Sequence, residues 1–218
     1  MTPLVCFMET DMKKFAWRLT LAIMLLPTLA SASPITFGNN AYEFIPGVFS
    51  FDQANTAAQA LTFQGVSGHL VTILSAEENA FVLSLIAPVE HSVWIGASDR
   101  AVEGVWRWVT GEQFWQGAGG GAPGPDVFYA NWALGQPDDF GTGQDVATIF
   151  GGSVANPALA GRWDDGGSGP GVGGGIFQRD GYIVEFDGVV PEPSTLLLFG
   201  TGGLGLMATL RRRKKPQA

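Results

Sequence analysis

Acidic side chains are spread unevenly along the chain, and the clustered ones are the residues best suited to site chemistry. Seven stand in or beside segments that read as loops: Asp99, Glu103, Asp138, Asp139, Asp145, Asp164 and Asp165. Carboxylates that are brought together in a partly buried site repel one another. Calcium relieves that repulsion because it takes roughly six to eight oxygen ligands. The pattern therefore favours a calcium site, although solvated acidic loops are the plainer alternative and no stretch has EF-hand spacing.

Other site chemistries are poorly supported. The single Cys6 lies before or within the N-terminal export signal described below, which excludes disulfides, cysteine catalysis and cysteine zinc sites from the rest of the chain. His69 and His91 are remote in sequence from the acidic clusters, so zinc is a poor candidate and both are expected to be structural or exposed. A glycoside hydrolase with two carboxylates is an alternative, but no nucleophile–base pair is present. We expect a protein that is not an enzyme.

The charge balance argues against nucleic acid as a partner. Residues 33–189 contain 17 acidic residues against four arginines and no lysine, a formal charge of −13. Such a domain repels phosphate backbones. Divalent cations are the more natural partner.

The N-terminus predicts a signal peptide over residues 1–32. Lys13 and Lys14 precede an apolar run too short to span a bilayer, and Ala30-Ser31-Ala32 offers a signal peptidase site before Ser33. The start codon stays open between Met1, Met8 and Met12, and an amphipathic structural helix is the alternative.

The C-terminus predicts a transmembrane helix over residues 194–210. This stretch lacks charge and is followed by the basic run 211–215. At about 1.5 Å per residue it reaches roughly 25 Å, marginal for a bilayer core of about 30 Å. The basic run would stay cytoplasmic and leave the preceding domain outside.

The same tail resembles a known sorting signal. Val190-Pro191-Glu192-Pro193-Ser194, an apolar span and a terminal basic cluster are similar to the PEP-CTERM signal over residues 190–218. The resemblance implies cleavage by an exosortase, a membrane protease-transpeptidase of exopolysaccharide-producing bacteria. The protein would then be exported, anchored transiently in the membrane, and released to the cell surface or matrix. A permanent C-terminal anchor is the alternative.

Between these ends, residues 33–189 are expected to form one α+β domain. Two helices are indicated early, one after Ser50 to Leu61 and one from Ser75 to a stop at Pro88, each with capping-box spacing. Short strands are expected at 42–45, 71–73, 93–96, 105–109, 147–150 and 182–186. Long Gly-rich loops, especially 117–124 and 166–175, separate the later strands.

The order of several motifs resembles the C-type lectin-like domain over residues 36–187. The motifs are Gly68–Ile73, Trp94-Ile95-Gly96, Asn131-Trp132, Gly135-Gln136-Pro137-Asp138 and Trp163-Asp164-Asp165. The resemblance implies two helices with irregular antiparallel sheets and long loops. It also implies that the tryptophans are mostly core residues, and that Val146 and Val184 replace the family's disulfide cysteines.

The resemblance also implies site residues. A calcium ion that holds sugar would be bound by Gln136, Asp138, Gln144, Asp164 and Asp165. Sugar would contact Gln136, Asp138, Phe140, Gln144 and Asp164, with Phe140 stacking on it or simply packing in the loop. A second, structural calcium would take Asp99, Glu103, Asp139 and Asp145. Gln144 departs from the family's glutamate, and the Gln-Pro-Asp loop is similar to galactose-type members.

Two functions follow. The first is a calcium-dependent carbohydrate-binding surface or matrix protein that takes one or two Ca²⁺ and has a glycan or exopolysaccharide as partner. The second is a structural or adhesive protein of the same fold without sugar binding, since a fold does not fix function.

Overall fold

The computed structural model describes residues 33–126, 129–141, 143–170 and 178–189. The predicted signal peptide, the transmembrane helix 194–210 and the sorting segment all lie outside these ranges. Within the described part, no helix combines the length and apolarity needed to cross a bilayer.

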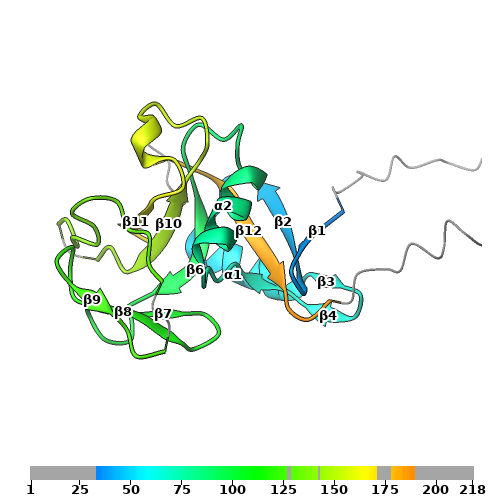
Figure 1. Ribbon diagram of the computed structural model, residues 1–218, viewed down its shortest axis with the longest axis horizontal. Helices are drawn as coiled ribbons and strands as arrows, with labels where there is room; N and C mark the ends of the chain where they lie inside the picture. The colour runs from blue at the N-terminus through cyan, green and yellow to red at the C-terminus, as the bar shows by residue number, and fades with distance from the viewer. Residues whose placement is uncertain (1–32, 127–128, 142, 171–177, 190–218) are drawn as a thin grey trace, which may run out of the picture. The chain divides into compact units, whose positions relative to one another are not determined.

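The described residues form two α-helices and twelve strands (Figure 1). The helices are α1 (Phe51–Ala60) and α2 (Ala76–Leu85). The first strands are β1 (Ile35–Phe37), β2 (Asn40–Pro46), β3 (Thr62–Phe63), β4 (Val66–Ser67), β5 (His69–Leu70) and β6 (Ser92–Ser98). The later strands are β7 (Val105–Trp108), β8 (Gln113–Gln116), β9 (Ala122–Pro123), β10 (Val146–Phe150), β11 (Trp163–Gly166) and β12 (Arg179–Phe186), with a short 3-10 helix at Pro157–Leu159.

Local capping places both helices. Ser50 accepts a hydrogen bond from the backbone of Gln53, and the Gln53 side chain accepts one from Ser50 N, so the predicted capping box of α1 is complete. At α2 the Ser75 hydroxyl caps Glu78 N, but the Glu78 carboxylate accepts hydrogen bonds from Leu74 N and the Tyr42 hydroxyl instead of closing the box. The second helix therefore begins where predicted, but the capping box lacks the hydrogen bond from Ser75 N to the Glu78 carboxylate.

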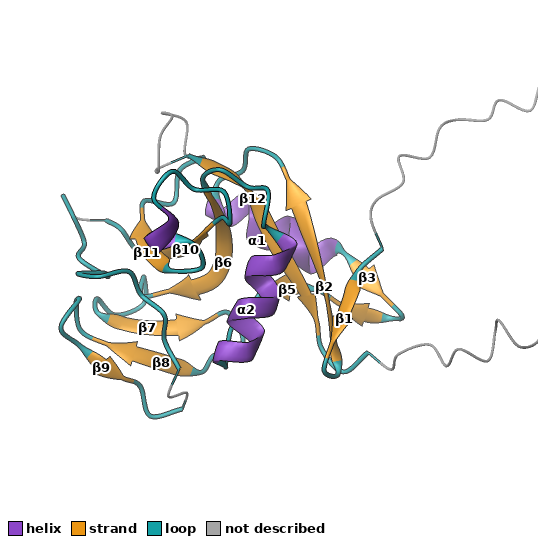
Figure 2. Cartoon of the chain, turned by 45° about the horizontal axis from the view of Figure 1, so that its top comes forward, coloured by secondary structure: helices purple, strands orange, loops and turns teal. Residues whose placement is uncertain are grey.

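Strand β12 lies between β2 and β6 in the sheet, and its two faces hold the two helices (Figures 1 and 2). It pairs antiparallel with β2 and β5, and in parallel with β6. Successive side chains of a strand point to opposite faces. Accordingly Val184 packs in the cluster that contains Ala54 and Ala58 of α1, whereas Ile183 packs with Val82 of α2.

A second group of strands extends from β6 and forms the loop-rich end of the domain (Figure 2). On one side, β6 continues into β7, β8 and β9. On the other, β10 pairs with β6 and with β11. The α+β class with irregular sheets is confirmed, and the parallel β12–β6 pairing is an addition to the expected antiparallel pattern.

Two local expectations are corrected. The strand expected at 71–73 is instead β5 at His69–Leu70, because Val71 donates to Ile183 O and accepts from Gly96 N without continuing a ladder. Asp164 and Asp165, expected in or beside a loop, lie within β11. Their backbone pairs with Thr148 and Ala147 of β10, which fixes them in a strand despite two adjacent carboxylates.

The predicted core roles hold. The side chains assigned to the core are buried: Trp94, Trp106, Trp108, Trp132 and Trp163. Val146 and Val184 are fully buried in one apolar cluster, so packing occupies the places where the family has cysteines.

Candidate calcium and ligand site

Three carboxylates of the predicted second calcium site converge where β6 and β10 lie side by side. Asp99 follows β6 directly and Asp145 precedes β10 directly, and the two strands pair through Ser98 and Val146. Asp99 N donates to Asp145 O at 3.2 Å. With Glu103 they form a group whose ligand oxygens lie within 4.8 Å of one another. Strand pairing thus brings together residues 46 positions apart in the chain.

The turn after β6 orients Asp99. Val102 N donates to Asp99 O, and Gly104 N donates to the Asp99 Oδ2 at 2.9 Å. The Asp99 side chain is buried, and its Oδ1 has no hydrogen-bond partner. Burial raises the pKa of Asp99 to about 6, with Glu103 and Asp145 adding to the rise. A buried carboxylate oxygen without a donor is costly unless a cation faces it.

A cavity of about 30 Å³ lies beside this group. Asp99 and Glu103 line it, together with Asp139 from the 136–144 loop and Asp165 from β11. The structure therefore brings Asp139 to the cavity, as expected for the second site. It also brings Asp165, which the sequence assigns to the sugar-site calcium. The oxygen-only donor set and the unpartnered Asp99 Oδ1 fit a calcium ion.

The loop that carries the predicted sugar ligands is held by side chains bonded to backbone. Asp165 accepts from Asp138 N and from Asp139 N, at 3.0 and 2.8 Å through its Oδ2. Gln144 N donates to Asp139 Oδ1 at 3.1 Å. Phe140 N donates to Gln144 Oε1 at 2.6 Å and more weakly to Asp138 Oδ1 at 3.3 Å. Asp138, Gln144 and Asp165 are thus neighbours in space, clamped from β11.

Asp164 is the most buried of the predicted sugar ligands after Asp165. Burial raises its pKa to about 6; Asp165 and Asp138 raise it further, whereas Arg179 lowers it. Arg179 is itself buried, lies over the Trp94 ring at 5.1 Å and donates to Ser92 Oγ. Sequence reasoning missed this arginine, the first residue of β12, although its being one of only four arginines in residues 33–189 was a usable signal.

The other residues predicted for the sugar site differ in how close they lie to one another and in how exposed they are. Gln136 ends a turn that is closed by the hydrogen bond from its N–H to Ala133 O, and its peptide bond to Pro137 is cis. The side-chain Oε1 of Gln136 is buried and has no hydrogen-bond partner. The Phe140 side chain is 82% exposed. Among the described residues, two groups of three carboxylate or histidine ligands come within 4.8 Å, and Asp138 with Asp164 and Asp165 is not one of them.

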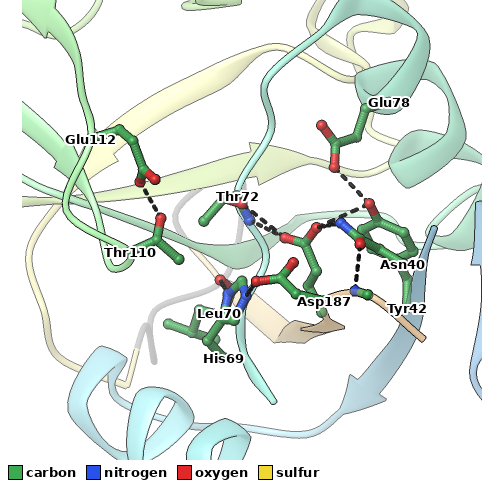
Figure 3. A network of polar contacts seen from close by, with 11 residues as sticks. Asn40, Tyr42, His69, Leu70, Thr72, Glu78, Thr110, Glu112 and Asp187 are labelled. Atoms are coloured by element: carbon green, nitrogen blue, oxygen red, sulfur yellow. Dashed lines mark hydrogen bonds and ion pairs between the residues drawn. The ribbon is translucent and has the colours of Figure 1, made fainter. Parts of the chain in front are cut away.

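The other group that meets this distance is His69, Glu185 and Asp187. Figure 3 shows the polar contacts around His69 and Asp187. The Glu185 carboxylate is already satisfied by Asn40, by the Tyr42 hydroxyl and by Thr72 through both its N–H and its hydroxyl.

His69 Nδ1 lies 2.8 Å from Leu70 O and its Nε2 lies 3.0 Å from Asp187. Burial lowers the pKa of His69, but the Leu70 carbonyl, Glu185 and Asp187 raise it, and the net shift is upward. His91 likewise contacts Asp180 at 2.8 Å. Both histidines meet carboxylates despite their distance in sequence, and His69 joins a network that ties β2, β5 and β12 together.

Family models match both predicted parts of the chain. The Lectin C-type domain matches residues 52–166, more than half of the 218 residues. The PEP-CTERM protein-sorting motif matches residues 189–214 and indicates export and a surface location. Both predicted resemblances are confirmed.

Curated relatives include lectins. The chain is 31% identical over 108 residues to the alpha-N-acetylgalactosamine-specific lectin of Patiria pectinifera (48% of this chain, 56% of that one). It is 32% identical over 127 residues to human C-type lectin domain family 4 member E (57% and 51%). It is 28% identical over 160 residues to halomucin of Haloquadratum walsbyi (72% and 2%). The chain thus spans about half of the lectins' length and a small fraction of halomucin.

Solved structures share the fold. The C-type lectin CEL-I of Cucumaria echinata has a TM-score of 0.54 at 20% identity and covers 72% of this chain and 96% of its own. The cow C-type carbohydrate-recognition domain of CD23 has a TM-score of 0.54 at 24% identity, with coverages of 73% and 96%. Proteins of this family and fold are generally non-enzymatic. The chain therefore belongs to the C-type lectin domain family and carries a PEP-CTERM protein-sorting motif.

Proposed function

We propose that the domain is a calcium-dependent glycan-binding module that is displayed on the cell surface or in an exopolysaccharide matrix. The observation that carries the proposal is the buried Asp99 Oδ1, which has no donor and stands beside a cavity lined by further carboxylates. The repulsion among these groups needs a counter-charge, and the domain's few arginines do not line that cavity.

The cavity site would take calcium through Asp99, Glu103 and Asp139, which line the cavity together with Asp165. Asp145 would be the fourth ligand, since its carboxylate groups with those of Asp99 and Glu103 within 4.8 Å. Its role would be structural, because it would join the turn after β6 to the 136–144 loop. That loop has no disulfide within the chain to hold it, since Cys6 is the chain's single cysteine. Calcium would therefore contribute order as well as charge.

The sugar site would take calcium through Gln136, Asp138, Gln144, Asp164 and Asp165. When bound, the ion supplies positive charge and open coordination positions for sugar hydroxyls. The chain's own side chains orient the ligand. Gln136 has an amide oxygen free of protein donors, and the exposed Phe140 ring offers an apolar face. Galactose-type specificity is part of the proposal, supported by the Gln-Pro-Asp sequence and by the name of the Patiria relative.

Processing completes the proposal. A signal peptidase would act after Ala32, the segment 194–210 would hold the protein in the membrane, and an exosortase would act at the sorting motif. This route delivers the domain to a glycan-rich exterior, where glycan or exopolysaccharide is the partner.

One observation favours a second function, a structural or adhesive protein without sugar recognition. Gln144 stands where the family uses a glutamate ligand, and its Oε1 already accepts the Phe140 N–H. An amide oxygen lacks charge and here has a competing partner, which weakens the sugar-site ion. The cavity site would still bind calcium and stabilise the fold.

Binding to a broad glycan panel, measured with calcium, with magnesium and with chelator, separates these functions. We expect binding in calcium that is lost in chelator and in an Asp164→Ala variant, which removes the ligand oxygen, while the matched exposed substitution Glu90→Ala leaves it intact. Glycan binding that persists in chelator contradicts the proposal. Calcium-dependent thermal stabilisation with no glycan bound supports the second function.

A further inference from the structure

The two most exposed large apolar side chains in the described part of the chain bracket the predicted sugar loop. Leu134 is 105% exposed and Phe140 82%, whereas the other exposed large apolar residues range from 37% to 60%. Single exposed apolar residues are common on protein surfaces. Two extreme cases on either side of the loop that carries Gln136 and Asp138 are a specific arrangement.

Leu134 stands at the tip of a tight turn. Gln136 N donates to Ala133 O at 3.0 Å, and Gly135 has a φ of +93°, which together describe a type II turn with Leu134 at its second position. Because that position points away from the fold and the side chain is fully exposed, the leucine contributes nothing to the core. A polar residue would serve the turn equally well.

The turn lies beside the strand that carries Asp164 and Asp165. Trp132 forms a parallel bridge with Trp163, and Ala133 N donates to Trp163 O at 2.8 Å. From this bridged pair, the segment after Trp132 continues to Leu134 and the segment after Trp163 continues to Asp164. Leu134 therefore emerges next to the strand end that supplies predicted sugar-site ligands.

The turn packs closely on the Gly-rich segment beneath it. A Cβ at Gly119 would lie 2.2 Å from Gly135 O, so the backbone of the Gly-rich segment packs directly against the turn. An exposed side chain on a fixed support loses little backbone entropy when it binds, which favours a contact role.

We infer that Leu134 is a specificity-determining residue for a glycan that bears an apolar group, such as an alkyl or acyl substituent, beside the bound sugar. The inference rests on the proposed sugar binding and deepens it. Leu134 packs against the apolar group while the polar loop residues hold the sugar. If about half of the surface of three methylene groups is buried, affinity rises roughly sevenfold.

The test compares butyl with methyl glycosides, as the β-galactoside and the α-mannoside, on the full chain in lipid nanodiscs with calcium. For the wild type we expect the butyl form of the bound sugar to bind roughly sevenfold more tightly. In Leu134→Ser the ratio should fall to about one while the affinity for the methyl glycoside is kept. The control Val48→Ser exchanges another exposed apolar residue (59% exposed) and should keep the wild-type ratio.

The outcomes separate the two proposals. A wild-type ratio near one, or a ratio unchanged in Leu134→Ser, overturns the role of Leu134 and leaves sugar binding standing. If neither sugar binds in either form, the proposed sugar binding fails and the role of Leu134 falls with it. Equal thermal midpoints for the wild type and both variants establish that the comparison is made between folded proteins.

Discussion

Replacing Asp99 by asparagine should stabilise the calcium-free protein and weaken its response to calcium. The side chain is buried among carboxylates, and burial first, then Glu103 and Asp145, raises its pKa from 3.8 to about 6. A shift of this size corresponds to about 1–2 kcal/mol of destabilisation at neutral pH once solvent screening is allowed for. Asparagine keeps the shape and an acceptor for Gly104 N while it removes the charge.

Thermal unfolding in chelator and in calcium measures both effects. For a domain of this size, about 1–2 kcal/mol corresponds to a rise in the midpoint of roughly 2–8 °C in chelator. In calcium at about 100 times its Kd, the wild type should gain about 2.7 kcal/mol, and Asp99→Asn should lose most of that gain. Glu90→Gln removes an exposed charge and should shift the midpoint by no more than about 2 °C in either condition.

The reasoning is refuted if Asp99→Asn lowers the midpoint in chelator while retaining the full calcium response. That result would mean that the Asp99 carboxylate is satisfied in the free protein and that calcium binds elsewhere.

Three further predictions follow from the site. Gly119→Ala should shift the 133–136 turn and weaken glycan binding at least several-fold, because the added Cβ would meet Gly135 O. The control Gly120→Ala, which has open space around it, should leave binding unchanged. Equal affinities for the two variants would show that the Gly119 contact does not position the turn for binding. The stability advantage of Asp99→Asn over the wild type in chelator should be absent below about pH 4 and complete above about pH 7. The reason is that the raised pKa of Asp99 makes the wild type lose stability as pH rises through about 6. Denaturant titrations that give the same difference in unfolding free energy across this range contradict the charge explanation. A galacturonate should bind more weakly than galactose, because residues 33–189 carry a formal charge of −13 and repel the sugar's carboxylate. This difference in affinity should grow as ionic strength falls. Tighter galacturonate binding at low salt, measured by calorimetry, would contradict the prediction.

Local signals in the sequence predicted local structure well. Ser50 with Gln53 marked the start of α1, and the turn and strand motifs placed most of β6, β7, β10 and β12. Family motifs in order predicted the fold as a whole. These features depend on neighbours in sequence or on a recognised pattern, so a single chain is enough to see them.

Features set by long-range packing were not visible. Strand β11 was missed because carboxylates at Asp164 and Asp165 disfavour a strand locally, and only pairing with β10 overrides that preference. The contact between His69 and Asp187 joins residues 118 positions apart. The burial of Arg179 near Asp164 depends on the close approach of Gly166, where a Cβ would lie 2.5 Å from the guanidinium. Contacts between residues so far apart in sequence leave no local pattern from which they can be predicted.

Calorimetric titration of calcium into the chelator-treated protein at pH 6, in two buffers of different ionisation enthalpy, tests the central claim most directly. We expect saturable binding of one or two ions with proton release, because burial and neighbouring carboxylates raise the pKa of Asp99 and Asp164 to about 6 and bound calcium requires the ionised forms. Heats that stay flat up to about 10 mM calcium, well above the range of extracellular calcium modules, would contradict it.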